Sequence, residues 1–352
     1  MFAILAATLG LLASLVIGET LLRVYVASRG WTPNCYVTGL IFFVPHERAG
    51  YTLRPNLRLK SSTYDVTTTS EGLRASQPIA TPQHADQPSH TRILVLGGSS
   101  VFGYLVPDGL DSCVALETAL KNELGDEQSI DVLNAGVPGY NIQQCRLRFE
   151  DDLGELNPDY VLLYLGWNDT KFIISESPEQ LDATPDAPAL WQRLCANSVL
   201  YGVVRYRIFP PAAPKFAIPP SSQTRVTEAG SEYFLGQLRQ LVASIRSAGA
   251  TPIISTQLMA ATSTSNSLTA FLGEDEEQIA ANRAVGQWIT DQLRAIALAE
   301  KITLIDTAAQ VECDDQTLGD AIHLTQLGHE KVAAAWAETI SEKLLESEAA
   351  AN

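Results

Sequence analysis

Four short stretches of the chain gather residue types that acyl-transfer chemistry needs. They are GGSSVFG from Gly97, NAGVPGYN from Asn134, GWND from Gly166 and GDAIH from Gly319. A serine hydroxyl becomes a good nucleophile when a neighbouring base removes its proton, and histidine is the usual base near neutral pH. Asparagine amides and backbone N–H groups can stabilise the oxyanion that then develops. The four stretches together hold the residue set that a nucleophilic acyl-transfer site needs.

The glycine-rich stretch from Gly97 does not fit other common motifs. It lacks the G-x-G-x-x-G spacing of dinucleotide-binding turns, and no P-loop lysine follows it. With Ser99 as the serine of a G-x-S-x-G nucleophile elbow, position 101 would be glycine, and it is Val101. A Gly-Gly-Ser turn by itself is more often a simple turn, so its interpretation depends on the other three stretches.

These stretches follow predicted strands of an alternating strand–helix pattern. Buried-type strands are predicted at 92–97, 130–136, 160–166, 251–256 and 302–306, and helices at 112–125, 142–156, 232–249, 276–300 and 326–347. Such alternation is typical of a parallel sheet with helices on both faces. Ligands bind beyond the carboxyl ends of the strands in such sheets, so we expect the four stretches to converge there.

Read together, the stretches resemble the SGNH (GDSL-type) hydrolase family over residues 91–350. Gly97-Gly98-Ser99 corresponds to the first family block, Gly136 to the second, Gly166-Trp167-Asn168-Asp169 to the third and Asp320-Ala321-Ile322-His323 to the last. The third and last blocks match in full, whereas Gly98 stands where the family usually has Asp. TTTSEGLRASQ (67–77) also resembles a bacterial branch whose members carry an N-terminal membrane segment.

The resemblance implies roles for five residues. Ser99 would be the nucleophile, His323 its base, and Asp320 the carboxylate that orients the imidazole. The oxyanion would be held by the backbone N–H groups of Ser99 and Gly136 and by the side-chain amide of Asn168. No metal or other cofactor is implied.

Two neighbouring residues have less specific interpretations. Ser100 offers a second hydroxyl in the first turn, but the family register places the nucleophile at Ser99. Asp169 is interpreted as a structural residue that supports its loop. The loss of the family Asp at Gly98 leaves the hydroxyl, the base and the oxyanion donors in place.

The expected fold is a three-layer α/β sandwich with a mainly parallel five-stranded sheet, the flavodoxin-like arrangement of SGNH hydrolases. It would occupy residues 91–350, preceded by an extended, β-rich segment and linker over 27–90. An insertion over 175–227, rich in proline, is expected to form a lid or a pocket wall. Its aromatic residues are Trp191, Tyr201, Tyr206, Phe209 and Phe216.

Residues 1–26 are expected to form a membrane anchor helix. The stretch Phe2–Gly18 has seventeen residues without a charge, which as a helix would span roughly 26 Å, close to a bilayer core of about 30 Å. A cleaved signal peptide and an ordinary buried helix are the alternatives. The absence of a basic segment before the stretch, and of a small-x-small site before Glu19, favours an uncleaved anchor.

Composition narrows the function classes and leaves the compartment open. The formal net charge of −16 argues against a protein that binds nucleic acid through phosphates. Cys35, Cys113, Cys145, Cys195 and Cys313 are scattered and show no metal-site spacing. Two arginines after the apolar stretch would weakly favour a cytoplasmic domain, whereas the bacterial resemblance favours placement on the periplasmic side.

The family resemblance leaves three function classes open. The preferred function is a serine ester hydrolase acting on an acyl or acetyl ester, in a small molecule or in an acylated carbohydrate or lipid of the cell envelope. An O-acyltransferase would use the same three catalytic residues to pass the acyl group to a sugar. A non-catalytic envelope binding protein would keep only the fold.

Overall fold

The computed structural model describes residues 1–32, 42–60, 65–75, 90–125, 129–181, 190–195, 198–204, 208 and 224–351. Most of the expected insertion at 175–227, with Tyr206, Phe209 and Phe216, lies outside these residues, as does Cys35. Cys113 and Cys145 are buried in the core, where packing is their evident role.

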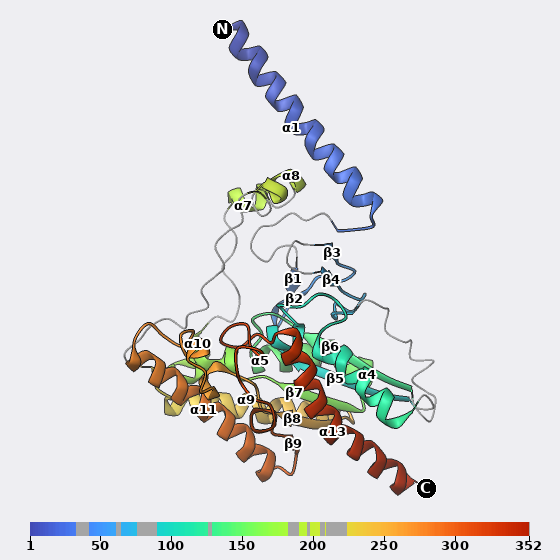
Figure 1. The fold of residues 1–352 in the computed structure, drawn as a ribbon, viewed down its shortest axis with the longest axis vertical. Coiled ribbons are helices and arrows are strands. Elements are labelled where there is room, and N and C mark those ends of the chain that lie inside the picture. Colours follow the sequence, from blue (N-terminus) through green and yellow to red (C-terminus); the bar gives the residue numbers. More distant parts are fainter. Residues whose placement is uncertain are drawn as a thin grey trace.

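A five-stranded, fully parallel sheet forms the centre of the α/β region (Figure 1). Its spatial order is β6-β5-β7-β8-β9. The strands are β5 (His90–Gly97), β6 (Ser129–Gly136), β7 (Tyr160–Tyr164), β8 (Thr251–Ser255) and β9 (Thr303–Ile305). Gly97 pairs with Gly136 on one side and with Tyr164 on the other, so three site-bearing strands end side by side.

Two layers of helices cover this sheet. Crossover connections between parallel strands are right-handed. The connection from β5 to β6 runs across the sheet in one direction, and those from β6 to β7, β7 to β8 and β8 to β9 run in the other, so the two sets lie on opposite faces. Accordingly α4 (Ser112–Leu124) packs with α13 (Gln326–Ala351), and α5 (Ile142–Asp151) packs with α9 (Glu228–Ser247). Phe234 of α9 contacts Trp288 of α11 (Glu276–Ala299), with ring centroids 5.6 Å apart. The expected three-layer α/β sandwich is confirmed.

Shorter elements connect these layers. They are α3 (Ser99–Phe102), η1 (Leu153–Leu156), η2 (Trp167–Asp169), α6 (Thr170–Ile173), η3 (Pro178–Gln180), η5 (Ala260–Thr262), α10 (Asn266–Thr269) and α12 (Thr307–Gln310). Of these, α3 and η2 carry site residues and lie directly after β5 and β7.

The segment before β5 packs into the same hydrophobic core. It forms two antiparallel hairpins, β1 (Phe43–His46) with β2 (Gly50–Leu53), and β3 (Arg58–Lys60) with β4 (Asp65–Thr67). Its apolar side chains Leu53, Leu57, Leu59, Val66 and Leu73 are buried in one cluster with the sheet. The hydrophobic core therefore extends into the β-rich segment that was expected over 27–90.

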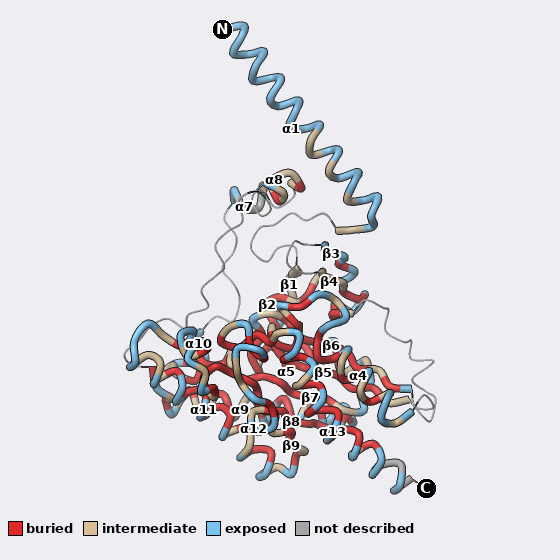
Figure 2. The backbone as a smooth tube through the Cα atoms, in the orientation of Figure 1, coloured by how far each residue is buried: buried red, intermediate tan, exposed pale blue. Residues whose placement is uncertain are grey.

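Helix α1 (Phe2–Ser28) projects away from the body, and none of its residues is buried (Figures 1 and 2). Its mean hydropathy reaches 2.0, so by length and composition it could cross a membrane. The described part of the insertion includes α7 (Leu190–Cys195) and α8 (Val199–Val203), and α8 contacts α1. None of the described residues of the insertion lines the pocket described below.

Candidate active site

The turn after β5 presents Ser99 at the carboxyl edge of the sheet. Ser99 is the first residue of α3, a single helical turn, and it is partly exposed, while Ser100, Val101 and Phe102 are buried. Only glycine fits at position 97, because a Cβ there would lie 2.3 Å from the Tyr164 carbonyl oxygen. The close packing of β5, β7 and α3 therefore fixes where the Ser99 hydroxyl lies.

Ser99, His323 and Asp320 are brought into one hydrogen-bonded chain. The Ser99 Oγ lies 2.8 Å from His323 Nε2, and His323 Nδ1 lies 2.7 Å from Asp320 Oδ2. The other Asp320 oxygen accepts the backbone N–H groups of His323 (2.9 Å) and Ile322 (3.0 Å). With Nδ1 protonated and donating to Asp320, Nε2 is left to accept the serine proton.

The surroundings keep Asp320 ionised and His323 in place. Burial favours the protonated form of Asp320, but hydrogen bonds from the His323 ring and from the backbone N–H groups of His323 and Ile322 lower the pKa of its carboxyl below the usual value. Tyr104 packs against the His323 ring with centroids 4.8 Å apart. His323 itself is only 3% exposed, and its Nε2 contacts Ser99 Oγ.

The two adjacent serines have different partners. Ser100 Oγ donates to the carbonyl of Ile322 (2.9 Å) and is buried, whereas Ser99 Oγ contacts the His323 ring. Ser100 therefore ties the α3 turn to the loop that carries His323.

A second serine–histidine pair lies in the interior. Ser112 Oγ is 2.7 Å from His329 Nδ1, which also accepts the Ser112 backbone N–H. Both residues are fully buried, and His329 Nε2 has no hydrogen-bond partner among the described residues. Burial lowers the pKa of His329 to about 3, so this ring stays neutral and caps the start of α4. A pair with no path to solvent and no carboxylate fits a structural role.

The loop after β7 carries Asn168 and Asp169 in opposite roles. Asn168 is partly exposed, and its Nδ2 donates to the Tyr140 carbonyl (2.8 Å). Asp169 is buried and accepts the Ile142 N–H at the start of α5 (3.1 Å). Burial raises the pKa of Asp169 to about 7, although the Ile142 N–H and Lys171 favour its charged form. Asp169 thus joins this loop to the turn after β6, as its structural interpretation implied.

Gly136 lies in a different place from the one expected. Its N–H donates to Asn134 Oδ1 (3.0 Å), and a Cβ on Gly136 would lie 2.2 Å from the Phe102 nitrogen. The residue is buried beneath α3 with its N–H already engaged, which corrects its assignment as an oxyanion donor. Gly139, three residues on, is exposed with φ +85°, and its N–H has no hydrogen-bond partner among the described residues.

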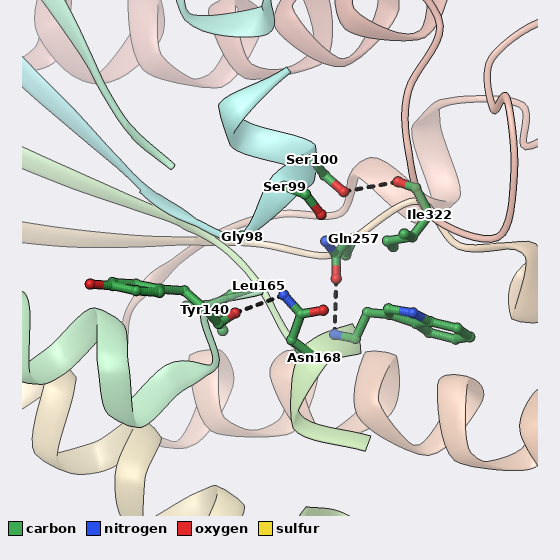
Figure 3. Close-up of a pocket in the computed structure, with 10 residues that line it drawn as sticks. Gly98, Ser99, Ser100, Tyr140, Leu165, Asn168, Gln257 and Ile322 are labelled. Atoms are coloured by element: carbon green, nitrogen blue, oxygen red, sulfur yellow. Dashed lines mark hydrogen bonds between the residues drawn. The ribbon is translucent and has the colours of Figure 1, made fainter. Parts of the chain in front are cut away.

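A shallow hollow opens beside Ser99 (Figure 3). It encloses about 210 Å³ of empty space, including its open mouth. The Trp167 N–H donates to Gln257 Oε1 (3.1 Å) at its floor, which fixes the β7 and β8 loops relative to each other. The lining residues are Gly98, Ser99, Ser100, Tyr140, Leu165, Gly166, Trp167, Asn168, Gln257 and Ile322.

Comparison with known protein families identifies the chain. Residues 95–331 match the family described as GDSL-like lipase/acylhydrolase, a range that includes Ser99, Asn168, Asp320 and His323. The chain belongs to this family. The expected enzyme class, a GDSL-type esterase or acylhydrolase, is thereby confirmed, and no curated protein matches the chain in sequence.

Several solved structures resemble the GDSL-type chain. One is an acetyl xylan esterase, with 16% identity, a TM-score of 0.42, and coverage of 71% of this chain and 99% of that one. A GDSL-like lipase from Bacteroides thetaiotaomicron has 15% identity, a TM-score of 0.41 and coverage of 75% and 95%. A catalytic mutant of an acetylxylan esterase from Geobacillus stearothermophilus has 15% identity, a TM-score of 0.42 and coverage of 70% and 93%.

The GDSL-type site also depends on an arginine outside its four sequence blocks. Arg74, 2% exposed, lies in the segment before β5, and its backbone N–H donates to the Asn134 carbonyl of β6 (3.1 Å). Its guanidinium donates to the carbonyls of Phe102, Gly103 and Val106 and to Asp108 Oδ1. Arg74 therefore holds the end of α3, the turn that begins at Ser99. In the sequence, only the position of Arg74 in the family-like stretch 67–77 could have indicated this role.

Proposed function

We propose that this GDSL-family protein is a serine ester hydrolase that uses Ser99, His323 and Asp320. The observation that carries the proposal is the 2.8 Å contact between Ser99 Oγ and His323 Nε2, continued by the 2.7 Å contact between His323 Nδ1 and Asp320 Oδ2. The partly exposed hydroxyl beside an open hollow is accessible to an ester, unlike the buried Ser112.

The reaction proceeds in two halves. His323 Nε2 takes the Ser99 proton as Oγ bonds to the ester carbonyl carbon, and the carbonyl oxygen becomes an oxyanion. The intermediate collapses, the ester C–O bond breaks, and His323 gives its proton to the departing alcohol. Water then attacks the acyl-Ser99 ester with His323 again as base, releasing the carboxylic acid and restoring the Ser99 hydroxyl. Asp320 stabilises the imidazolium in both halves.

Three donors are available for the oxyanion. The N–H of Ser99, in the first turn of α3, has no acceptor among the described residues, and the same holds for the N–H of Gly139. The Asn168 amide has two N–H bonds, and its hydrogen bond to the Tyr140 carbonyl uses only one of them. In the proposed site Gly139 takes the part expected of Gly136. Fixed donors of this kind are each worth about 2.7–4 kcal/mol in transition-state stabilisation.

The size of the hollow supports a short acyl group. Apart from its open mouth, the hollow has room for about one water-sized group. We therefore propose an acetyl or similar short ester, carried on an envelope carbohydrate or lipid. Rates on p-nitrophenyl acetate, butyrate and octanoate test this, with kcat/KM expected to fall as the chain lengthens. A preference for octanoate would contradict it.

The membrane anchor belongs to the same proposal. Tyr25 and Trp31 contact each other at the end of α1, and Arg29 lies over both rings, an arrangement suited to a membrane interface. We place the catalytic domain on the extracytoplasmic side. Protease added to spheroplasts should then digest it, whereas protection until the spheroplasts are lysed would reverse the orientation.

Labelling with a fluorophosphonate probe tests the catalytic assignment. Wild-type protein should be labelled and should hydrolyse p-nitrophenyl acetate, and Ser99→Ala should lose both properties. Ser112→Ala is the matched control, because it removes the hydroxyl of the other serine–histidine pair, and it should keep labelling. Labelling lost in Ser112→Ala but kept in Ser99→Ala would overturn the assignment. Acylated sugar formed from an acyl donor would identify transfer instead of hydrolysis.

A further inference from the structure

The carboxylate of Glu19 holds the start of helix α8. It accepts the backbone N–H groups of Val199 (3.0 Å) and Leu200 (2.8 Å) and the Ser198 hydroxyl (3.0 Å). Glu19 also pairs with Arg23 on its own helix (2.7 Å). A helix start has N–H groups without partners inside the helix, so this carboxylate supplies what α8 lacks. Two segments nearly 180 residues apart in sequence are thereby joined.

The position of Glu19 along α1 determines the depth of α8 relative to the membrane. The uncharged stretch of α1 ends at Gly18, and a Cβ on Gly18 would lie 3.8 Å from Leu200 Cδ2. Glu19 is thus the first charged residue after the apolar span. If that span fills the bilayer core, α8 lies at the boundary between acyl chains and headgroups.

Large apolar side chains of the same segment are left uncovered. Leu190 is 73% exposed and Trp191 57% exposed, and Ile208 beyond α8 is also exposed. Among the described residues none of the three packs into the hydrophobic core. Tryptophan is enriched at membrane interfaces because its ring is apolar and its N–H is polar. In Figure 1, α7 and α8 lie beside α1 and away from the sheet.

We propose that α7 and α8 form a second membrane contact, in which Glu19 fixes α8 at the base of the anchor and Leu190 and Trp191 enter the headgroup region. The occupant of this apolar surface is a lipid surface, because the neighbouring α8 contacts α1, whose apolar side chains are exposed. The inference rests on the proposed retention of α1 as an anchor and is independent of the ester chemistry. It also accounts for the position of these two helices, which a lid over Ser99 does not.

Fluorescence quenching in vesicles tests the contact. The full chain is reconstituted into phosphatidylethanolamine–phosphatidylglycerol vesicles containing lipids brominated either high or low on the acyl chain. We expect stronger quenching by the shallow label, and Trp191→Phe should remove much of that quenching. Trp288→Phe is the matched control, because Trp288 packs against Phe234 in the catalytic region, and it should leave the quenching unchanged.

Variants at Glu19 test the link to the anchor. Glu19→Ala removes the acceptor for three donors and should reduce the Trp191 quenching about twofold or more, whereas Glu19→Gln keeps an acceptor oxygen and should lie between it and wild type. Quenching unchanged in Glu19→Ala would overturn the Glu19 link. Protein that floats with vesicles but shows no Trp191 quenching would overturn the second contact while leaving the anchor. Protein that does not float would overturn both, with esterase activity measured separately.

Discussion

The side-chain amide of Asn168 occupies the space that a side chain on residue 98 would need. A Cβ built on Gly98 would lie 2.5 Å from Asn168 Nδ2 and 3.3 Å from the Tyr140 carbonyl oxygen, which is the acceptor for that amide. The glycine that departs from the usual family block therefore permits the close approach of Asn168. The size of residue 98 and the position of the Asn168 amide are therefore linked in this chain.

Restoring a side chain at position 98 should impair the enzyme. Gly98→Ala, and more strongly the family-like Gly98→Asp, would push the Asn168 amide away from Tyr140 and from the proposed oxyanion. We expect kcat on p-nitrophenyl acetate to fall by on the order of tenfold or more, as for a misplaced oxyanion donor. Gly236→Ala, with no atom within 4 Å of the new Cβ, should leave kcat unchanged. A faster Gly98→Asp enzyme would show that the pairing is not functional.

Removing the Asn168 amide should affect kcat more than KM. Asn168→Ala loses a donor that acts on charge present only in the transition state, so kcat should fall by about 10²–10³ while KM changes little. The variant should still react with a fluorophosphonate, more slowly, because Ser99 and His323 remain. A rise in KM alone would place Asn168 in ground-state binding instead.

Burial of Asp169 should make stability depend on pH. With its pKa raised from 3.8 to about 7, the folded protein keeps a proton that the unfolded chain releases above about pH 4. The free energy of unfolding should therefore decrease as the pH rises from about 4 to about 7, by up to about 1.4 kcal/mol per pH unit from this group.

Asp169→Asn should flatten that dependence, because its amide oxygen can still accept the Ile142 N–H but cannot ionise. Urea unfolding in detergent across this pH range measures the effect. Asp315→Asn, at an exposed loop position, serves as the control and should retain the wild-type slope. Equal slopes in wild type and Asp169→Asn would show that Asp169 does not titrate in this range.

Loss of Arg74 should weaken both the fold and the catalytic turn. Arg74→Ala leaves the carbonyls of Asp65, Phe102, Gly103 and Val106 without this donor and Asp108 without its ion-pair partner. Removing one member of such a buried charged network costs about 3–5 kcal/mol, which a lowered melting temperature would reveal. Arg74→Lys should recover little, because one ammonium cannot reach all five acceptors.

Arg58→Ala is the control for Arg74, since Arg58 is exposed in the same segment and should be tolerated. Measured at a temperature where the variants remain folded, kcat should also fall for Arg74→Ala. An unchanged kcat in the folded variant would restrict Arg74 to stability.

The sheet, its helices and the Ser99–His323–Asp320 grouping could be predicted because each left a local mark in the sequence. Strands buried on both faces produce apolar runs, and the site residues come directly after them or in an intact Asp-x-x-His block. The choice between Gly136 and Gly139 could not be made this way. It depends on which N–H the Asn134 side chain takes, and that is decided by packing beneath α3.

Long-range contacts account for the remaining differences. Arg74 is one charged residue in a polar stretch, and its burial depends on carbonyls about thirty residues away that the chain presents only when α3 has formed. Helix α8 of the expected lid lies by α1 because of Glu19, which looks in sequence like the ordinary polar end of an apolar helix. Neither contact leaves a periodic pattern.

The hydrogen bond from Ser100 to the Ile322 carbonyl has a consequence for the timing of the reaction. In the proposed reaction Ser99 becomes acylated, so its hydroxyl no longer bonds to the His323 imidazole, and the loop of His323 loses that hydrogen bond to the α3 turn. The neighbouring serine is not consumed, so its tie persists through the life of the covalent intermediate. The base that must activate water is thereby kept in register between the two halves of each turnover.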